Sequence, residues 1–170
     1  MTGLDEQDLE RRGFEGFVKV SELRQGVQRV PSQKGVYAVL RLSESEPAFL
    51  PRSPASWFKG KDPTVSQAEL SENWVHGAQT LYIGSADDLR ARIDLLIQFS
   101  DAGQARSVFH WGGRLLWQLA DSDDLAVAWK AAPAGIGSAQ RDLVIEFREE
   151  FGQLPYANLR LPPVRTSGAT

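Results

Sequence analysis

Thr80-Leu-Tyr-Ile-Gly-Ser-Ala-Asp-Asp-Leu-Arg-Ala-Arg92 is the stretch of sequence from which the fold can be read most directly. It predicts a strand, a glycine turn and a helix. Leu81 and Ile83 are typical strand formers, and Gly84 permits backbone angles that other residues avoid. We therefore expect this unit to place a strand end and a helix start beside each other.

The helix of this unit carries an arginine on its apolar side. Ser85 or Asp87 can cap the helix, with Asp88 in its first turn, where an acid suits the positive end of the helix dipole. Arg92 can be a snorkelling side chain or an internal ion-pair partner. It can also be a cation aimed into a cleft at an anion, but the helix alone favours the first reading. The apolar residues that share this face are Leu89, Ile93, Leu96 and Ile97.

Two short triplets on separate strands favour the second role for Arg92, that of a cation in a cleft. Gly35-Val36-Tyr37 and Tyr82-Ile83-Gly84 resemble the paired signature of the GIY-YIG nuclease superfamily, and Arg92 lies eight residues beyond the last glycine, as in that family. The resemblance extends from about Val30 to Asn158. Three further segments resemble a bacterial subgroup of the superfamily: Phe58–Thr64, His110–Arg114 and Leu154–Asn158.

The resemblance implies a DNA endonuclease that hydrolyses phosphodiesters with a divalent metal. In that family the two tyrosines lie beside the cleft and the arginine stabilises the phosphate, which makes Tyr37, Tyr82 and Arg92 the expected catalytic residues. A glutamate on a later helix holds Mg²⁺ or Mn²⁺ in the family, and the matching position here is Gln140. Asp142 is a possible substitute ligand. Tyrosines in strands are also common core residues, so the joint spacing carries the assignment.

Three positions depart from the family pattern. Ser85 replaces a frequent lysine, Leu96 replaces a frequent tyrosine or histidine, and Gln140 replaces the metal-binding glutamate. A hard divalent cation prefers an anionic oxygen, so glutamine is a poor ligand and makes the cofactor doubtful. The alternative function is a non-catalytic module of the same fold that binds nucleic acid or a protein partner.

Charge limits the expected DNA binding. The net charge of −3 argues against tight, indiscriminate binding, which depends on many cations meeting phosphates. A local basic cleft remains compatible with an acidic chain. His110 alone is more often a structural histidine, but its glycine-rich surroundings and Arg114 make it a candidate cleft residue. The residues expected to form this cleft or contact nucleic acid are Arg92, Arg106, His110, Arg114, Lys61 and Asn158.

The chain of 170 residues suits one domain. We expect an α+β fold, GIY-YIG-like, with a small three-stranded sheet, mixed or antiparallel, flanked by helices. The expected strands are 36–42, 80–84 and 125–130, with a possible short strand at 14–20. The expected organisation is a mobile N-terminal segment at 1–13, a domain at 14–159 and a tail at 160–170. Within the domain, an insertion at 43–79 is either a substrate-facing loop or an arm packed on the core.

Composition bears on the compartment. The chain has no cysteine, so a disulfide framework and a thiolate metal site are both impossible. No segment reaches the apolar length of a membrane span, and the N-terminus is acidic rather than signal-like. We therefore expect a cytoplasmic protein without membrane attachment. The oligomeric state is left open.

Overall fold

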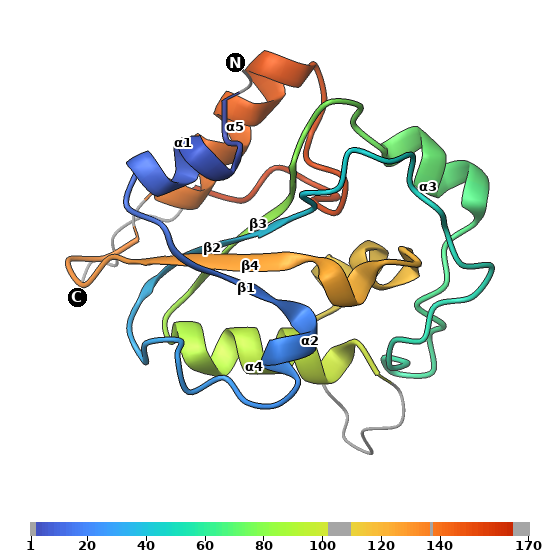
Figure 1. Cartoon of the computed structure of the whole chain (residues 1–170), viewed down its shortest axis with the longest axis horizontal. Coiled ribbons are helices and arrows are strands. Elements are labelled where there is room, and N and C mark those ends of the chain that lie inside the picture. The colour runs from blue at the N-terminus through green and yellow to red at the C-terminus, as the bar shows by residue number, and fades with distance from the viewer. Residues whose placement is uncertain (1–2, 102–109, 137, 165–170) are drawn as a thin grey trace.

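The computed structural model describes residues 3–101, 110–136 and 138–164 (Figure 1). The sheet strands are β1 (Glu15–Lys19), β2 (Gly35–Leu40), β3 (Thr80–Ala86) and β4 (Ala126–Ala131). The α-helices are α1 (Glu6–Arg11), α2 (Val20–Leu23), α3 (Gln67–Asn73), α4 (Leu89–Phe99) and α5 (Ala139–Phe151). Two 3₁₀ helices precede β4, namely η1 (Trp111–Gln118) and η2 (Ser122–Asp124).

The sheet has four strands in the order β1-β4-β2-β3, and each neighbouring pair is antiparallel. The expected α+β class is confirmed, whereas the expected count of three strands is wrong. The additional strand is β1, which pairs with β4 at one edge. A bulge between Gly16 and Val18 interrupts the alternation of β1, and Phe17 lies there with a φ of 53°. This extra residue weakens the period-two pattern by which a strand is recognised.

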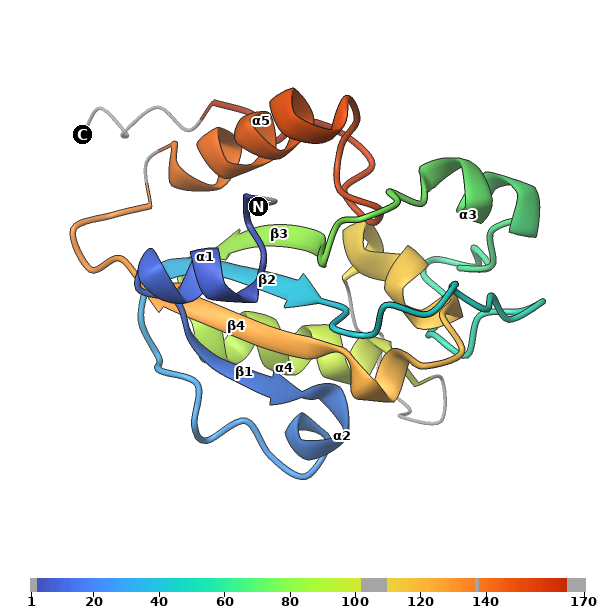
Figure 2. The ribbon, with the colours of Figure 1, turned by 45° about the horizontal axis from the view of Figure 1, so that its top comes forward.

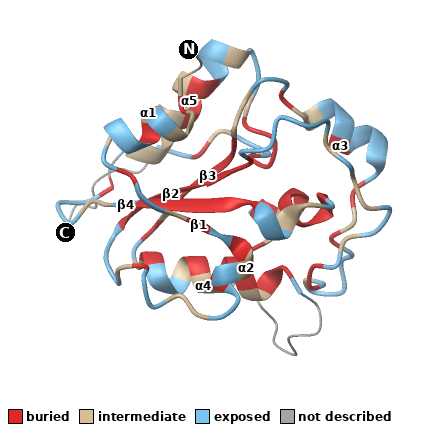
Figure 3. Ribbon diagram, viewed as in Figure 1, coloured by how far each residue is buried: buried red, intermediate tan, exposed pale blue. Residues whose placement is uncertain are grey.

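Helices lie on both sides of the sheet (Figure 2), and the buried apolar side chains form two clusters, one on each face. Tyr37 and Val39 of β2 pack with α2 and α4, whereas Val36, Ala38 and Leu40 pack with α1 and α5 on the other face. Successive side chains of β2 therefore face opposite layers of the core. Figure 3 shows that the central strands are buried along most of their length, because helices cover both faces.

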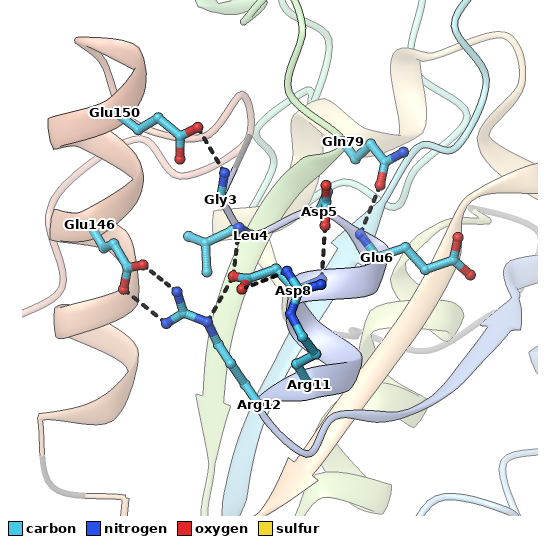
Figure 4. Close-up of polar contacts among 10 residues, drawn as sticks. All are labelled: Gly3, Leu4, Asp5, Glu6, Asp8, Arg11, Arg12, Gln79, Glu146 and Glu150. Carbon is cyan, nitrogen blue, oxygen red and sulfur yellow. Dashed lines mark hydrogen bonds and ion pairs between the residues drawn. The ribbon is translucent and has the colours of Figure 1, made fainter. Parts of the chain in front are cut away.

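The N-terminal residues are packed against α5 and are not the loose end expected at 1–13 (Figure 4). Leu4 and Leu9 are 1% and 2% exposed. Arg12 forms an ion pair with Glu146 of α5, and its Nε donates to Asp8 at 2.8 Å. These contacts lie outside any regular sequence pattern, which explains why the first residues read as polar and unstructured. Residues 1–2 lie outside the described part of the chain.

The insertion at 43–79 packs on the core through two aromatic side chains. Phe49 and Trp74 lie 6.1 Å and 5.2 Å from the ring of Tyr156, measured between centroids. Buried Arg41 holds the start of the insertion by pairing with Asp121 at 2.8 Å and donating to backbone carbonyls at 43 and 45. Most of the insertion is therefore an arm packed on the core. One short hairpin within it, at 58–61, contributes Phe58 to the cleft described below.

The N-cap of the helix that follows β3 lies one residue after the predicted cap Asp87 and three residues after the alternative, Ser85. Asp88 is the N-cap of α4, and its carboxylate accepts a hydrogen bond from the backbone N–H of Ala91 at 3.1 Å. Gly152 ends α5 in the left-handed conformation, as its position after the apolar pattern predicts. Among the described residues, no helix is both long and apolar enough to cross a membrane.

Candidate functional site

A cleft of about 630 Å³ is lined by five of the predicted site residues, namely Tyr82, Arg92, Arg114, Gln140 and Asn158. Tyr82 reaches it from β3, Arg92 from α4, Arg114 from η1 and Gln140 from α5. The remaining described residues along its walls are Phe58, Trp111, Gly112, Leu159, Arg160, Pro162 and Pro163. Three arginines therefore face this cleft, and no aspartate or glutamate is among the described residues that line it.

Tyr37 lies directly behind the cleft rather than on its surface. Its side chain is 0% exposed, and its ring centroid is 6.0 Å from that of Tyr82. A Cβ added to Gly84 would come within 2.4 Å of the Tyr37 ring carbon Cζ. Glycine at this position therefore makes room for the tyrosine of the opposite strand, since the register pairs Tyr37 with Gly84. The two triplets are thus in physical contact with each other.

His110 is a buried partner of Tyr37. Its Nε2 and the Tyr37 hydroxyl are joined by a hydrogen bond of 2.6 Å, and His110 is 0% exposed. Burial, together with the positive charge of Arg92, lowers the pKa of His110 to about 3, so the ring is neutral at physiological pH. The structure gives no support to the expectation that His110 contacts nucleic acid, because its side chain is buried behind the cleft and bonded to Tyr37.

Arg92 is the positively charged residue that acts on both tyrosines, Tyr37 and Tyr82. Burial raises the pKa of Tyr37 well above its ordinary value of 10.0, and burial also raises the pKa of Tyr82. The charge of Arg92 opposes both rises. Tyr82 is 8% exposed and is the tyrosine whose side chain borders the cleft. Both phenols are consequently neutral hydrogen-bonding groups at neutral pH.

Gln140 is held as a neutral hydrogen-bonding residue. Its Oε1 accepts from the Ser85 hydroxyl at 2.8 Å, and its Nε2 donates to the backbone carbonyl of Ile83 at 3.0 Å. The two departures from the family pattern at 85 and 140 therefore contact each other. An amide oxygen already bonded to a hydroxyl, with an N–H₂ group beside it, is a poor ligand for a hard cation.

Asp142 does not replace the missing carboxylate. It is exposed, accepts from the Ser138 hydroxyl at 2.8 Å and does not border the cleft. In the described part of the chain, no group of three His, Cys, Asp or Glu residues is arranged to hold a metal ion. The segments outside it, 1–2, 102–109, 137 and 165–170, contain neither aspartate nor glutamate. The residues present therefore do not fit the divalent metal that the resemblance implies.

Asn158 lines the cleft, but its side-chain amide is hydrogen-bonded to the edge strand β3. Its Oδ1 accepts from the N–H of Ile83 at 2.8 Å, and its Nδ2 donates to the carbonyl of Ile83 at 3.0 Å. The amide thus imitates a neighbouring strand along β3, which is an edge strand. The expectation that Asn158 contacts nucleic acid is not supported, since both of its polar atoms are engaged.

Several cleft residues lie where the sequence suggested no site. Arg160, Pro162 and Pro163 belong to the predicted tail, yet they form a wall of the cleft. The Arg141 guanidinium fixes this wall by donating to the carbonyl of Pro162 at 2.7 Å. A cation just after the last helix is the signal that could have pointed to Arg160. Arg106 and the end of the tail, 165–170, lie outside the described residues.

Phe58 and Trp111 form the aromatic side of the cleft. Their ring centroids are 5.9 Å apart, and the Arg114 guanidinium lies 4.7 Å from the centroid of Trp111. Lys61 pairs with Phe58 across a short hairpin at the rim. The predicted basic residues Arg92, Arg114 and Lys61 are therefore brought to the same region.

Comparisons of this chain with protein-family models, with curated proteins and with solved structures give no match.

Proposed function

We propose that this protein binds nucleic acid through the Arg92 cleft, on a GIY-YIG-type scaffold whose metal-assisted hydrolysis is weakened or lost. One observation carries the proposal: the cleft of an acidic protein is lined by three arginines and no acid among its described residues. Guanidinium groups bind phosphate oxygens with directed hydrogen bonds. The aromatic side chains beside them suit the faces of bases.

The loss of hydrolysis follows from the donor set at 85 and 140. Ser85 and Gln140 satisfy each other as neutral partners, and Gln140 also bonds to Ile83. A divalent cation placed there would meet an amide instead of a carboxylate and would face nearby arginines. Three positive charges in a partly desolvated cleft favour an anion and disfavour an additional cation. Phosphate binding is therefore retained while the metal site is not.

A second candidate is an active GIY-YIG endonuclease. The observation that favours it is the convergence of Tyr37, Tyr82 and Arg92, because the charge of Arg92 acts on both phenols. In this candidate, phosphates of the bound nucleic acid would supply the negative charge that Gln140 lacks. The two candidates differ in whether the unmodified chain cleaves DNA in the presence of Mg²⁺ or Mn²⁺.

The binding test is fluorescence anisotropy of a labelled oligonucleotide in EDTA, between about 50 and about 200 mM salt. We expect salt-sensitive binding with a shallow slope, since few phosphates can be neutralised. Arg114→Ala should weaken binding and reduce the salt slope by about 1. Arg11→Ala is the matched control, because Arg11 lies on α1 and its side chain is 55% exposed. No binding by the unmodified chain even at low salt would contradict the proposal.

The hydrolysis test is plasmid nicking with Mg²⁺, with Mn²⁺ and with EDTA. We expect slow cleavage or none from the unmodified chain. Strong cleavage that needs the metal and disappears in Arg92→Ala would contradict the loss of hydrolysis and establish the second candidate. A contaminating nuclease would be recognised because it would cleave equally in the Arg92→Ala preparation.

A further inference from the structure

The aromatic side of the cleft indicates which form of nucleic acid it accepts. Phe58 and Trp111 are only partly buried and line the same cleft as the arginines. In a duplex the faces of the bases are stacked on one another, so an aromatic ring within a cleft cannot reach them. A single strand exposes its bases, and stacking on aromatic side chains is the way in which proteins hold single strands without reading sequence.

A tight hairpin places lysines around one of these rings. Phe58 and Lys61 exchange two backbone hydrogen bonds, of 3.1 Å and 2.8 Å, around the turn Lys59-Gly60. Both turn residues have positive φ, 49° and 75°, as in a two-residue hairpin of type I′. Side chains of directly paired residues share one face, so Lys61 lies on the same side as Phe58. The Lys59 ammonium is 5.2 Å from the centroid of the Phe58 ring.

The first turn residue, Lys59, has a backbone conformation that is unfavourable for lysine. Position 59 requires the left-handed conformation, which glycine, asparagine and aspartate adopt more readily. A lysine there is strained relative to one in an ordinary right-handed or extended conformation. Its side chain gains a position beside the ring of Phe58, where a cation can meet a phosphate while the ring meets a base.

The same hairpin carries an aromatic residue that does not face the cleft. Trp57 is 59% exposed and is not among the lining residues, whereas its neighbour Phe58 is. Successive side chains of an extended segment point to opposite faces, which accounts for the difference. The hairpin therefore offers one aromatic ring on the cleft side and a comparable ring on the other side.

We propose that the cleft takes single-stranded nucleic acid, with a base stacked at Phe58 and Trp111 and its phosphates between the arginines and the lysines of the hairpin. This inference rests on the proposed function and specifies its substrate class. Leu159, Arg160, Pro162 and Pro163 also line the cleft, and Arg141 anchors this segment through the carbonyl of Pro162. Unpaired segments of branched or looped nucleic acid present the same chemistry.

The test compares one oligonucleotide as a single strand and annealed to its complement, by fluorescence anisotropy in EDTA at one salt concentration. We expect the single strand to bind at least about tenfold more tightly. Phe58→Leu should weaken single-strand binding by about tenfold, the effect of losing about 1.4 kcal/mol of stacking. Trp57→Leu is the matched control and should change single-strand binding by less than about twofold.

Two further measurements keep the outcome interpretable. Lys61→Ala, an exposed substitution that leaves the core intact, should reduce the salt slope for the single strand by about 1. Thermal unfolding of Phe58→Leu establishes that the variant is folded. Equal affinity for the two forms, or equal effects of the Phe58 and Trp57 variants, would overturn the single-strand inference and leave the proposed function standing. Absence of binding to both forms at low salt would overturn the proposed function itself.

Discussion

At the scale of single residues, the two triplets matter because they pack against each other. Tyr37 lies on Gly84 of the neighbouring strand, and its hydroxyl is held by His110 at 2.6 Å. Gly84 and the two tyrosines therefore pack as one unit, in which the missing side chain of Gly84 leaves room for the ring of Tyr37 and that ring packs beside Tyr82. Arg92 is attached to this unit through charge, since it acts on both phenols and on the imidazole.

The close contact between Gly84 and Tyr37 predicts that a side-chain methyl group at position 84 destabilises the fold. Gly84→Ala should lower the free energy of unfolding by about 1–3 kcal/mol, because the new Cβ would overlap a buried ring that cannot move away. Urea denaturation measures the effect. Gly112→Ala is the matched control, since a Cβ there meets only the Tyr82 hydroxyl at 3.5 Å. Equal stability of both variants would mean that the ring has room to shift.

Buried His110 predicts a loss of stability in mild acid. Its pKa falls from 6.5 to about 3 on folding, so the unfolded chain binds a proton first as the pH drops. The histidine therefore destabilises the fold progressively below about pH 6.5, by about 2 kcal/mol at about pH 5. Urea midpoints between about pH 7 and about pH 5 should fall less in His110→Gln, whose side chain does not titrate. Parallel pH profiles for the two proteins would contradict this assignment.

At the scale of elements, β3 is an edge strand covered by the segment that follows α5. Ala157 donates to the carbonyl of Leu81 at 2.8 Å, and Asn158 satisfies both backbone groups of Ile83. An uncovered edge presents unpaired N–H and C=O groups that invite pairing with another chain. The segment therefore closes the sheet beside the cleft while its next residues form the cleft wall.

The role of Asn158 can be tested by removing its amide. Asn158→Leu should lower the free energy of unfolding by about 1–3 kcal/mol, since the N–H of Ile83 would be left buried without a partner. Asn73→Leu is the control, because Asn73 on α3 is only partly buried and its amide donates to the carbonyl of Glu69 within its own helix. A variant at 158 with unchanged stability but weaker nucleic-acid binding would restore the role that the resemblance suggested.

The sequence predicted the elements whose patterns are local. The apolar stripe of α4 is found, since burial on one face leaves a period in the sequence. The strand expected at 36–42 is found as β2, whose six residues are all buried and apolar or glycine. The strand β1 was missed as a member of the sheet because its bulge breaks the alternation. The packing of Leu4 and Leu9 depends on contacts with α5 and β3, which no local pattern records.

The candidate site was predictable where spacing alone places a residue. Tyr82 and Arg92 reach the cleft as the triplets and the offset suggested. The hydrogen bonds of His110 and Asn158 depend instead on which polar atoms meet in the fold, so the sequence could not show that both side chains are bonded within the protein. The cleft wall at 160–163 was hidden in a segment whose prolines resemble those of a tail.

At the scale of the whole molecule, the charge of the cleft is opposite in sign to the net charge of the chain. The chain has a net charge of −3, yet the described lining of the cleft contains Arg92, Arg114 and Arg160 and no acid. Such a local field concentrates anions at the cleft while the acidic remainder limits non-specific binding elsewhere. The position of Gln140 in this field decides whether a metal can be held, because a glutamate there would be the first negative group in the cleft.

Gln140→Glu tests this balance directly. Without metal, the variant should be less stable than the unmodified chain by about 1–3 kcal/mol, since a carboxylate loses the donor to the carbonyl of Ile83 and is repelled by that oxygen. Mg²⁺ or Mn²⁺ should recover part of this loss by neutralising the new charge, and more so when an oligonucleotide contributes phosphate oxygens. The unmodified chain should show no such gain, because its amide offers the metal no charge.

Thermal unfolding with and without metal, in EDTA-treated protein, measures the effect independently of cleavage. Gln153→Glu is a matched control that adds the same charge at an exposed position just after α5, where the amide donates to the carbonyl of Trp74. Metal should not favour that variant over the unmodified chain. An equal metal-induced rise in melting temperature for the unmodified chain and Gln140→Glu would show that another group binds the cation. The neutral pair of Ser85 and Gln140 would then not support the loss of hydrolysis that we propose.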